Sequence, residues 1–164
     1  MIARYQALRQ RIAQELEQLE RTVSAIQRHW EKARLSGPDQ DAYINSVALN
    51  LHSFYTGVER VLQLIAVEVD GGVLGGPSWH AELLRQMTVD VPAVRPPVLR
   101  TQTVQELDEY RKFRHLIRNI YTTNIDPDRI GQLVAKLPNV YAQLHQDLEA
   151  FLAFLDTLAR ADEE

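Results

Sequence analysis

The chain has 164 residues, of which 45% are hydrophobic and 24% are charged, and its net charge is −4 when histidine is neutral. These values are typical of one globular domain, which we expect to span residues 1–164 around a core of ordinary size. The absence of cysteine excludes a disulfide framework, a thiolate nucleophile and a cysteine-based zinc site, and the acidic balance argues against a general nucleic-acid coat.

The N-terminal residues are amphipathic and charged throughout, without the apolar core of a signal peptide. No run in the sequence approaches the ~18–20 apolar residues that a membrane-spanning helix needs. We therefore expect a cytoplasmic protein with no membrane segment.

Two long helices are predicted first. The first ends near Ser36-Gly37-Pro38, because glycine followed by proline is typical of a helix end. Its apolar residues recur at spacings of three and four: Ile2, Tyr5, Leu8, Ile12, Leu16, Leu19, Val23, Ile26 and Trp30. The second helix begins near Asp39 or Asp41, either of which can cap it, and ends at Asp70-Gly71-Gly72.

A long connection follows. The glycine-rich stretch GGVLGGP lacks the Gly-Lys-Ser/Thr ending of a phosphate-binding loop, and we interpret it as a connection. A short helix from Trp79 to Met87 is expected, with Ser78 as its cap, and we assign Trp79 and His80 to packing. The proline-rich residues 89–102 are then an irregular crossover, whose Arg95 and Arg100 could extend a basic face on the next helix.

Two further long helices complete the prediction. Thr103 and Glu106 have the spacing of a capping box for a helix from about Val104 to Tyr121. Asp126 and Pro127 have the types expected at the N-cap and first position of the last helix, which Pro138 should kink and which frays over about 160–164. The fold class is therefore all-α: an up-and-down bundle of four long helices with a short helix in a long crossover.

Basic residues gather in YRKFRHLIRNIYTTN, residues 110–124 of this acidic chain. Arg111, Arg114, Arg118 and Tyr121 share one sector of roughly 80° on a helix, and His115 flanks them. Such like charges repel by tenths of a kcal/mol per pair. Three interpretations are open: neutralisation by acids of the same helix or its neighbours, a phosphate or RNA site that uses arginine's bidentate geometry, and a protein-binding face.

The segment 114-RHLIRNIY-121 resembles the R-x4-H-x-Y motif of the HepT-like branch of the HEPN superfamily. Arg114 and Tyr121 match the motif's Arg and Tyr, and His115 stands where the family has a polar residue. Asn119 stands where the motif has its His.

The resemblance implies a homodimer and, in many family members, a metal-independent endoribonuclease that needs no cofactor. Arg114 would hold the scissile phosphate, with Arg111 and Arg118 beside it, and the motif His would transfer a proton during attack by the 2′-OH. It also implies a minimal nucleotidyltransferase (MNT) antitoxin that transfers AMP to Tyr121 and silences a toxin. Residues 114 and 119 lie about 140° apart on a helix, so a two-fold dimer could bring both around one cleft.

The departure at Asn119 matters for the chemistry. An amide does not titrate near neutral pH and cannot act as a general base, whereas His115 could. The candidate catalytic residues are thus Arg114, His115 and Asn119. The alternative to an endoribonuclease is a non-catalytic module that binds RNA, a nucleotide or a protein partner. No metal site is predicted, since His145 and Glu149 are more simply a surface pair.

Overall fold

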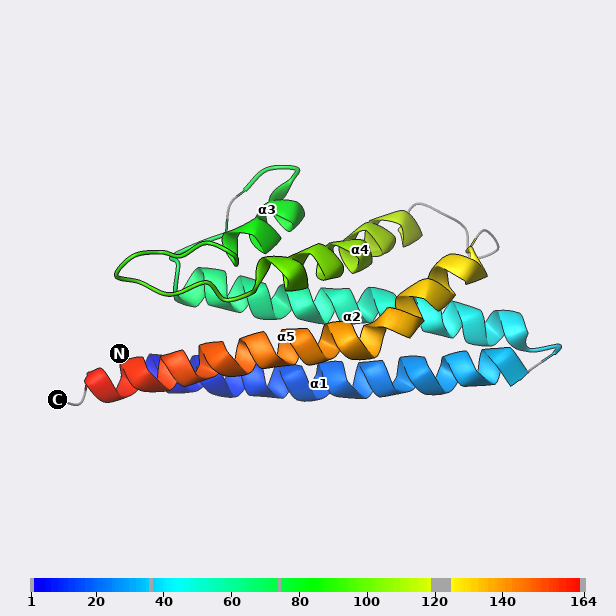
Figure 1. Cartoon of the computed structure of the whole chain (residues 1–164), viewed down its shortest axis with the longest axis horizontal. Coiled ribbons are helices and arrows are strands. Elements are labelled where there is room, and N and C mark those ends of the chain that lie inside the picture. The colour runs from blue at the N-terminus through cyan, green and yellow to red at the C-terminus, as the bar shows by residue number, and fades with distance from the viewer. Residues whose placement is uncertain (1, 36, 74, 119–124, 163–164) are drawn as a thin grey trace.

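Five α-helices make up the described part of the chain, which in this computed structural model covers residues 2–35, 37–73, 75–118 and 125–162. In chain order they are α1 (Ile2–Leu35), α2 (Gln40–Glu68), α3 (Trp79–Gln86), α4 (Thr101–Ile117) and α5 (Pro127–Ala161). The long helices run alternately up and down (Figure 1). The expected all-α bundle, with a short helix in a long crossover, is confirmed.

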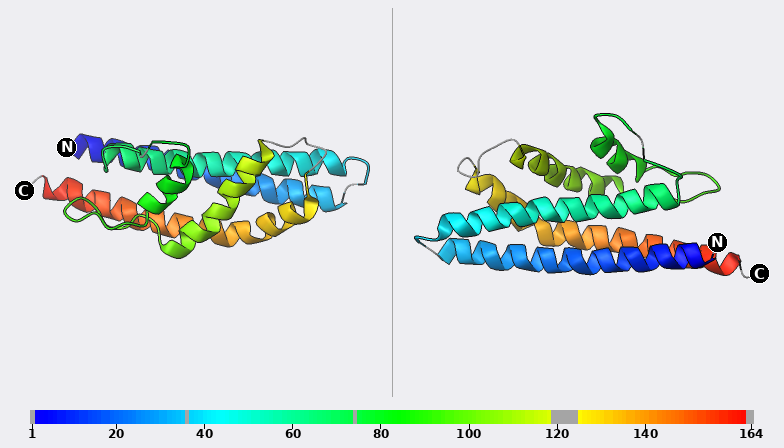
Figure 2. Two further views of the ribbon diagram at one scale, coloured as in Figure 1. Left: turned by 90° about the horizontal axis from the view of Figure 1, so that it is seen from above. Right: turned by 180° about the vertical axis from the view of Figure 1, so that it is seen from behind.

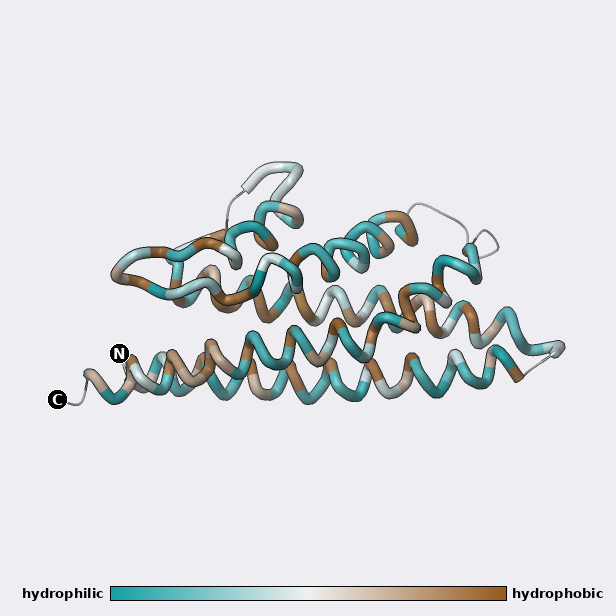
Figure 3. The backbone as a smooth tube through the Cα atoms, viewed as in Figure 1, coloured by the Kyte–Doolittle hydropathy of each residue, from teal (hydrophilic) through white to brown (hydrophobic). Residues whose placement is uncertain are grey.

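Helix α2 is the central element of the bundle. It packs against all four other helices, while α5 also lies along α1 and α4 crosses above α2 (Figure 2). Polar and apolar residues both recur from turn to turn along the helices, which is the pattern of amphipathic helices (Figure 3). In the core, Tyr110 of α4 meets Phe54 of α2 edge-on at 5.5 Å between ring centroids, and its hydroxyl donates to the Leu133 carbonyl of α5 at 2.7 Å. That contact ties three helices together.

Local signals set several helix ends as predicted. Helix α1 ends at Leu35, next to the glycine and proline, and α5 begins at Pro127 with the Asp126 carboxylate accepting from the Asp128 amide at 3.0 Å. Asp39 and Ser78 occupy the N-cap positions of α2 and α3, but their side chains make no capping hydrogen bond.

The predicted capping box at the start of α4 is wrong. The helix begins at Thr101, and the Thr103 hydroxyl donates not to its own helix but to Asp147 of α5, at 2.7 Å. The same carboxylate accepts from the Arg100 amide at 3.1 Å and from Arg100 Nε at 2.6 Å. A buried acid on another helix therefore caps α4.

Arg95, one of two arginines that could have extended the basic face, does not reach that face. The Arg95 side chain is fully buried, and both Nε and Nη2 pair with the Asp70 carboxylate, at 2.5 and 2.7 Å. Its remaining donors reach the carbonyls of Gln86, Val89 and Pro96. Arg95 fastens the crossover to the end of α2, and Arg100 is held by Asp147.

Helix α5 is continuous through Pro138 and bends along its length (Figure 1). It extends to Ala161, so residues 160 and 161 are helical rather than frayed as predicted. The last two residues, 163 and 164, lie outside the described part of the chain. The predicted end of α4 at Tyr121 lies outside the described residues. Among the described helices, none combines the length and the apolar character that crossing a membrane requires.

Substituting Asp70→Ala should strand the Arg95 guanidinium without a counter-charge in the protein interior. A broken buried ion pair typically costs about 3–5 kcal/mol, so we expect a loss of that size in the free energy of unfolding, measured in urea. Asp90→Ala is the matched control, because Asp90 is an exposed acid of the same crossover. Equal stabilities for the two variants would contradict the assigned role of Asp70.

Candidate functional site

Arg114 lies inside the protein rather than on its surface. Its side chain is 3% exposed, and Nη2 donates to Glu59 Oε2 of α2 at 2.8 Å. The guanidinium carbon also sits 4.7 Å from the centre of the Tyr55 ring, and Nη1 lies 3.4 Å from Thr56 Oγ1. Burial and the neighbouring Glu59 charge raise the pKa of Tyr55, so its ring is neutral beneath the cation.

Glu59 joins three helices. Besides Arg114 of α4, its Oε2 has the Nδ1 atom of His80, from the first turn of α3, at 2.7 Å. The Glu59 side chain is 8% exposed, whereas the His80 side chain is 29% exposed. The carboxylate is thus enclosed, and the imidazole reaches the surface.

The proton on His80 follows from the charges around it. A contact of 2.7 Å between Nδ1 and an ionised carboxylate oxygen requires Nδ1 to carry the hydrogen. The 3.1 Å between Arg114 Nη2 and His80 Nδ1 then separates two donors that share one acceptor. Nε2 is then the nitrogen that carries no hydrogen in the neutral ring.

Acids neutralise much of the predicted basic face. Arg111 pairs with Asp108 one turn earlier at 2.6 Å, and Lys112 lies 3.3 Å from the same carboxylate. Burial alone would raise the pKa of Asp108, but the hydrogen bonds and charges of Arg111 and Lys112 outweigh it and lower the pKa. Glu109 binds Arg129 of α5 at 2.6 Å, which lowers the pKa of Glu109. The first of the three interpretations is therefore confirmed for Arg111, Lys112 and Arg114.

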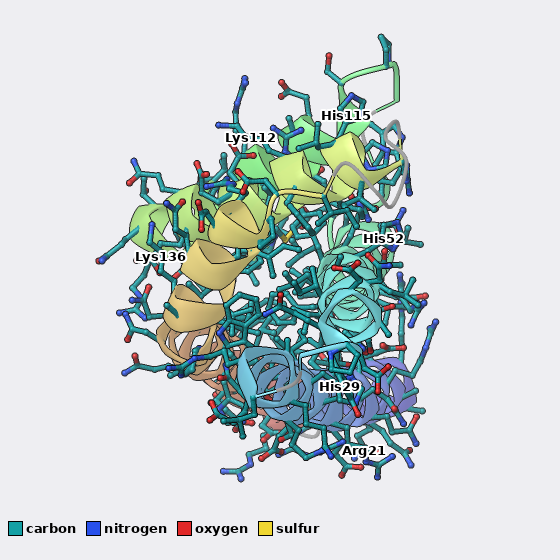
Figure 4. The ribbon with its side chains drawn as sticks, turned by 90° about the vertical axis from the view of Figure 1, so that its right-hand side faces the viewer. Arg21, His29, His52, Lys112, His115 and Lys136 are labelled. Atoms are coloured by element: carbon teal, nitrogen blue, oxygen red, sulfur yellow. The ribbon has the colours of Figure 1, made fainter. Side chains whose placement is uncertain are left out.

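Arg118 and His115 are exposed at the end of α4. Figure 4 shows His115 and Lys112 on the outer side of this helix and His52 on α2. Burial lowers the pKa of His52, and the charges of Arg118 and Arg114 lower it further, so both arginines lie near this histidine. Asn119 and Tyr121 lie outside the described residues.

An open groove of about 470 Å³ adjoins this region between α1 and α2. Its lining includes His52, near Arg118, and Thr56, which contacts Arg114. Arg60 and Glu15 cross it as an ion pair at 3.2 Å. The groove is lined by both polar and apolar residues of α1 and α2, and the Arg60–Glu15 pair balances one positive and one negative charge within it.

Glu59 and His80 were not predicted as site residues from the sequence. Glu59 interrupts the apolar residues of α2 one turn after Tyr55, and such an acid on a buried stripe signals a buried cationic partner. Nothing local to His80 marks it, since its partners lie 21 and 34 residues away. In the described residues no group of three or more potential ligands could hold a metal ion, and His145 and Glu149 are a surface pair 3.7 Å apart.

Substitution of Glu59 should destabilise the bundle, and the loss of stability should grow with the number of hydrogen-bond acceptors that the substitution removes. Glu59→Ala leaves Arg114 buried and unpaired, and we expect a loss of about 3–5 kcal/mol in the free energy of unfolding. Glu59→Gln retains one acceptor and should lose less. Glu109→Gln, at an exposed ion pair, is the control and should change stability by about 1 kcal/mol or less. The assignment fails if the Ala variant is as stable as this control.

The pKa of His52 offers a test of the position of Arg118. Because the folded-state pKa lies below the ordinary value of 6.5, the unfolded chain takes up a proton first as the pH falls. The contribution of His52 to stability is thus lost on acidification through that value. Arg118→Gln should raise the pKa of His52, measured by NMR titration, whereas Arg28→Gln on α1 should not. An unchanged pKa in the Arg118 variant would place that side chain elsewhere.

Comparison with known proteins gives one result that bears on identity. A family model described as HepT-like protein matches residues 46–155, from within α2 to near the end of α5. No curated protein and no solved structure matches the chain. The matched segment covers well over half of the 164 residues and contains Glu59, His80 and Arg114. The chain therefore belongs to the HepT-like family of the HEPN superfamily.

Proposed function

We propose that this protein is a HEPN-type, metal-independent endoribonuclease of the toxin-like kind, whose site lies at the end of α4. The observation that carries the proposal is the position of the motif arginine. Arg114 lies beside a surface imidazole and two helical turns of basic residues, within the segment that the family model matches. RNA is the ligand class that this chemistry suits, because arginine and histidine supply phosphate contacts and proton transfer.

The proposed phosphate contacts differ in how accessible they are. Arg118 is exposed, and Arg111 is partly exposed beside Asp108. A phosphate that approached Arg114 would have to compete with Glu59 for Nη2, because only 3% of the side chain is exposed. We therefore propose Arg118 as the first contact of the RNA backbone, with Arg111 beside it and Arg114 anchoring the site from below.

A homodimer is part of the proposal. The outer side of α4 carries Leu116, a large apolar residue that is 49% exposed, next to His115. An exposed leucine on the motif helix supports a contact between two copies of α4, and a two-fold contact would place two sites around one cleft.

The alternative function is a non-catalytic module that binds RNA, a nucleotide or a protein partner. Two observations favour it: Asn119 replaces the motif imidazole, and Arg114 is already ion-paired within the chain. Cleavage of RNA by the unmodified protein would remove this alternative.

An MNT-type nucleotidyltransferase that adds AMP to Tyr121 is the proposed regulatory partner. Mass spectrometry after co-expression with such an enzyme should show a mass increase on the peptide that contains Tyr121. The same peptide without modification, under conditions where the enzyme is active, would contradict this partnership.

The proposed function predicts RNA binding that depends on Arg118. In buffer with a chelator, Arg118→Gln should weaken binding of a single-stranded RNA by about tenfold and reduce the slope of log affinity against log salt by about 1. It should also slow cleavage. Arg21→Gln is the matched control, because Arg21 lies on α1 at the opposite side of the bundle (Figure 4). A protein that neither binds nor cuts RNA would overturn the proposal.

A further inference from the structure

We propose that His80, oriented by Glu59, supplies the imidazole for proton transfer that the motif lacks at Asn119. This inference rests on the proposed ribonuclease function and assigns a role to a residue outside the motif. His80 belongs to α3, and its Nδ1 lies 2.7 Å from Glu59 Oε2 and 3.1 Å from Arg114 Nη2. The crossover thus brings a histidine directly to the motif arginine.

The carboxylate fixes the ring in the orientation that a general base needs. A histidine that donates Nδ1–H to an acid keeps a lone pair on Nε2, and the acid stabilises the imidazolium that forms when Nε2 takes up a proton. Glu59 is enclosed and its position is set by Arg114, so it cannot swing away to water. The His80 side chain is 29% exposed, so part of the imidazole is open to a ligand.

The neighbouring Trp79 further restricts the imidazole. The two rings lie 3.7 Å apart between centroids, with their planes tilted by 30°. Trp79 itself packs on the hydrophobic core. The ring of His80 is therefore held by a hydrogen bond at one edge and by an aromatic surface on one face, and such preorganisation is typical of a working acid–base group.

Stability alone gives a weaker account of this arrangement. Arg114 already neutralises the Glu59 charge at 2.8 Å, so the buried ion pair does not need an imidazole. Buried charge networks are often no more stable than apolar packing of the same volume. A proton-transfer site, in contrast, requires a group such as His80 that connects the buried ion pair to the protein surface.

In the proposed reaction, Nε2 of His80 accepts the proton of an RNA 2′-OH while that oxygen forms a bond to the adjacent phosphorus. The bond between phosphorus and the 5′ oxygen breaks, and the leaving oxygen takes a proton from water. The products are a 2′,3′-cyclic phosphate and a 5′-hydroxyl end, after which the imidazolium returns its proton to solvent. Glu59 and Arg114 act as positioning residues in this scheme.

The test compares variants of the full chain in cleavage of a short single-stranded RNA with a chelator present. His80→Asn retains a donor for Glu59 but cannot take up a proton, and it should reduce kcat about 10²–10⁴-fold with RNA affinity and melting temperature nearly unchanged. His145→Gln is the matched control, because His145 lies on the surface of α5. An RNA with a 2′-deoxy sugar at the cleaved position should bind and resist cleavage.

Chemical rescue separates a catalytic role from a structural one. Added imidazole should restore part of the cleavage lost in His80→Ala, which a merely structural histidine would not allow. If the unmodified protein cleaves RNA and His80→Asn cleaves within threefold of it, the role of His80 is overturned while the proposed function stands. If the unmodified protein binds RNA without cleaving it, both the nuclease and the role of His80 are overturned.

Discussion

The arrangement of α2, α3 and α4 depends on two hydrogen bonds to one oxygen of Glu59. Through it α2 holds Arg114 of α4 at 2.8 Å and His80 of α3 at 2.7 Å. An arginine buried in a helical bundle needs a counter-charge, which Glu59 supplies to Arg114. The same oxygen ties the first turn of α3 to α2, beside the buried Leu83 and Leu84 of that short helix.

Two other charged contacts follow the same design. Asp70 holds Arg95 and thereby closes the crossover, and Asp147 caps α4 through Thr103 and Arg100. Asp147 belongs to α5, whereas Asp70 follows the end of α2, and each acid binds an arginine from a segment far away in the sequence. Apolar packing also stabilises the crossover, because Val98 and Leu99 are buried in the core beside these charged contacts.

The sequence predicts what depends on local chemistry. Apolar spacing predicts the long helices, and Gly37-Pro38 and Asp126-Pro127 mark two of their ends, because a helix end is satisfied by residues next to it. The sequence does not predict the partners of buried charges, because those are chosen by the packing of distant segments. Thr103 has the right spacing for a capping box, yet it bonds to an acid 44 residues away. The charge of Arg95 suggests a position on the protein surface. Arg95 is nevertheless buried, because it pairs with Asp70, which lies 25 residues away in the sequence.

The same limit applies to the site. The motif correctly predicts that Arg114 lies in the last turn of α4. The burial of Arg114 next to His80 could not be predicted, because the spacing of residues on one helix does not show which side chains α3 covers. Glu59 on the apolar stripe of α2 was the available signal. Its pairing with Arg114 and His80 turns a charge cluster into an ordered network that includes a partly exposed imidazole.

The protonation of His80 tests this account most directly. Two-dimensional 15N NMR of the imidazole reports which ring nitrogen carries the hydrogen. We expect neutral His80 to carry the hydrogen on Nδ1, in a hydrogen bond to Glu59 that is weakened or lost in Glu59→Gln, with Nε2 unprotonated. A neutral His80 with its hydrogen on Nε2, unaffected by substitution of Glu59, would contradict it.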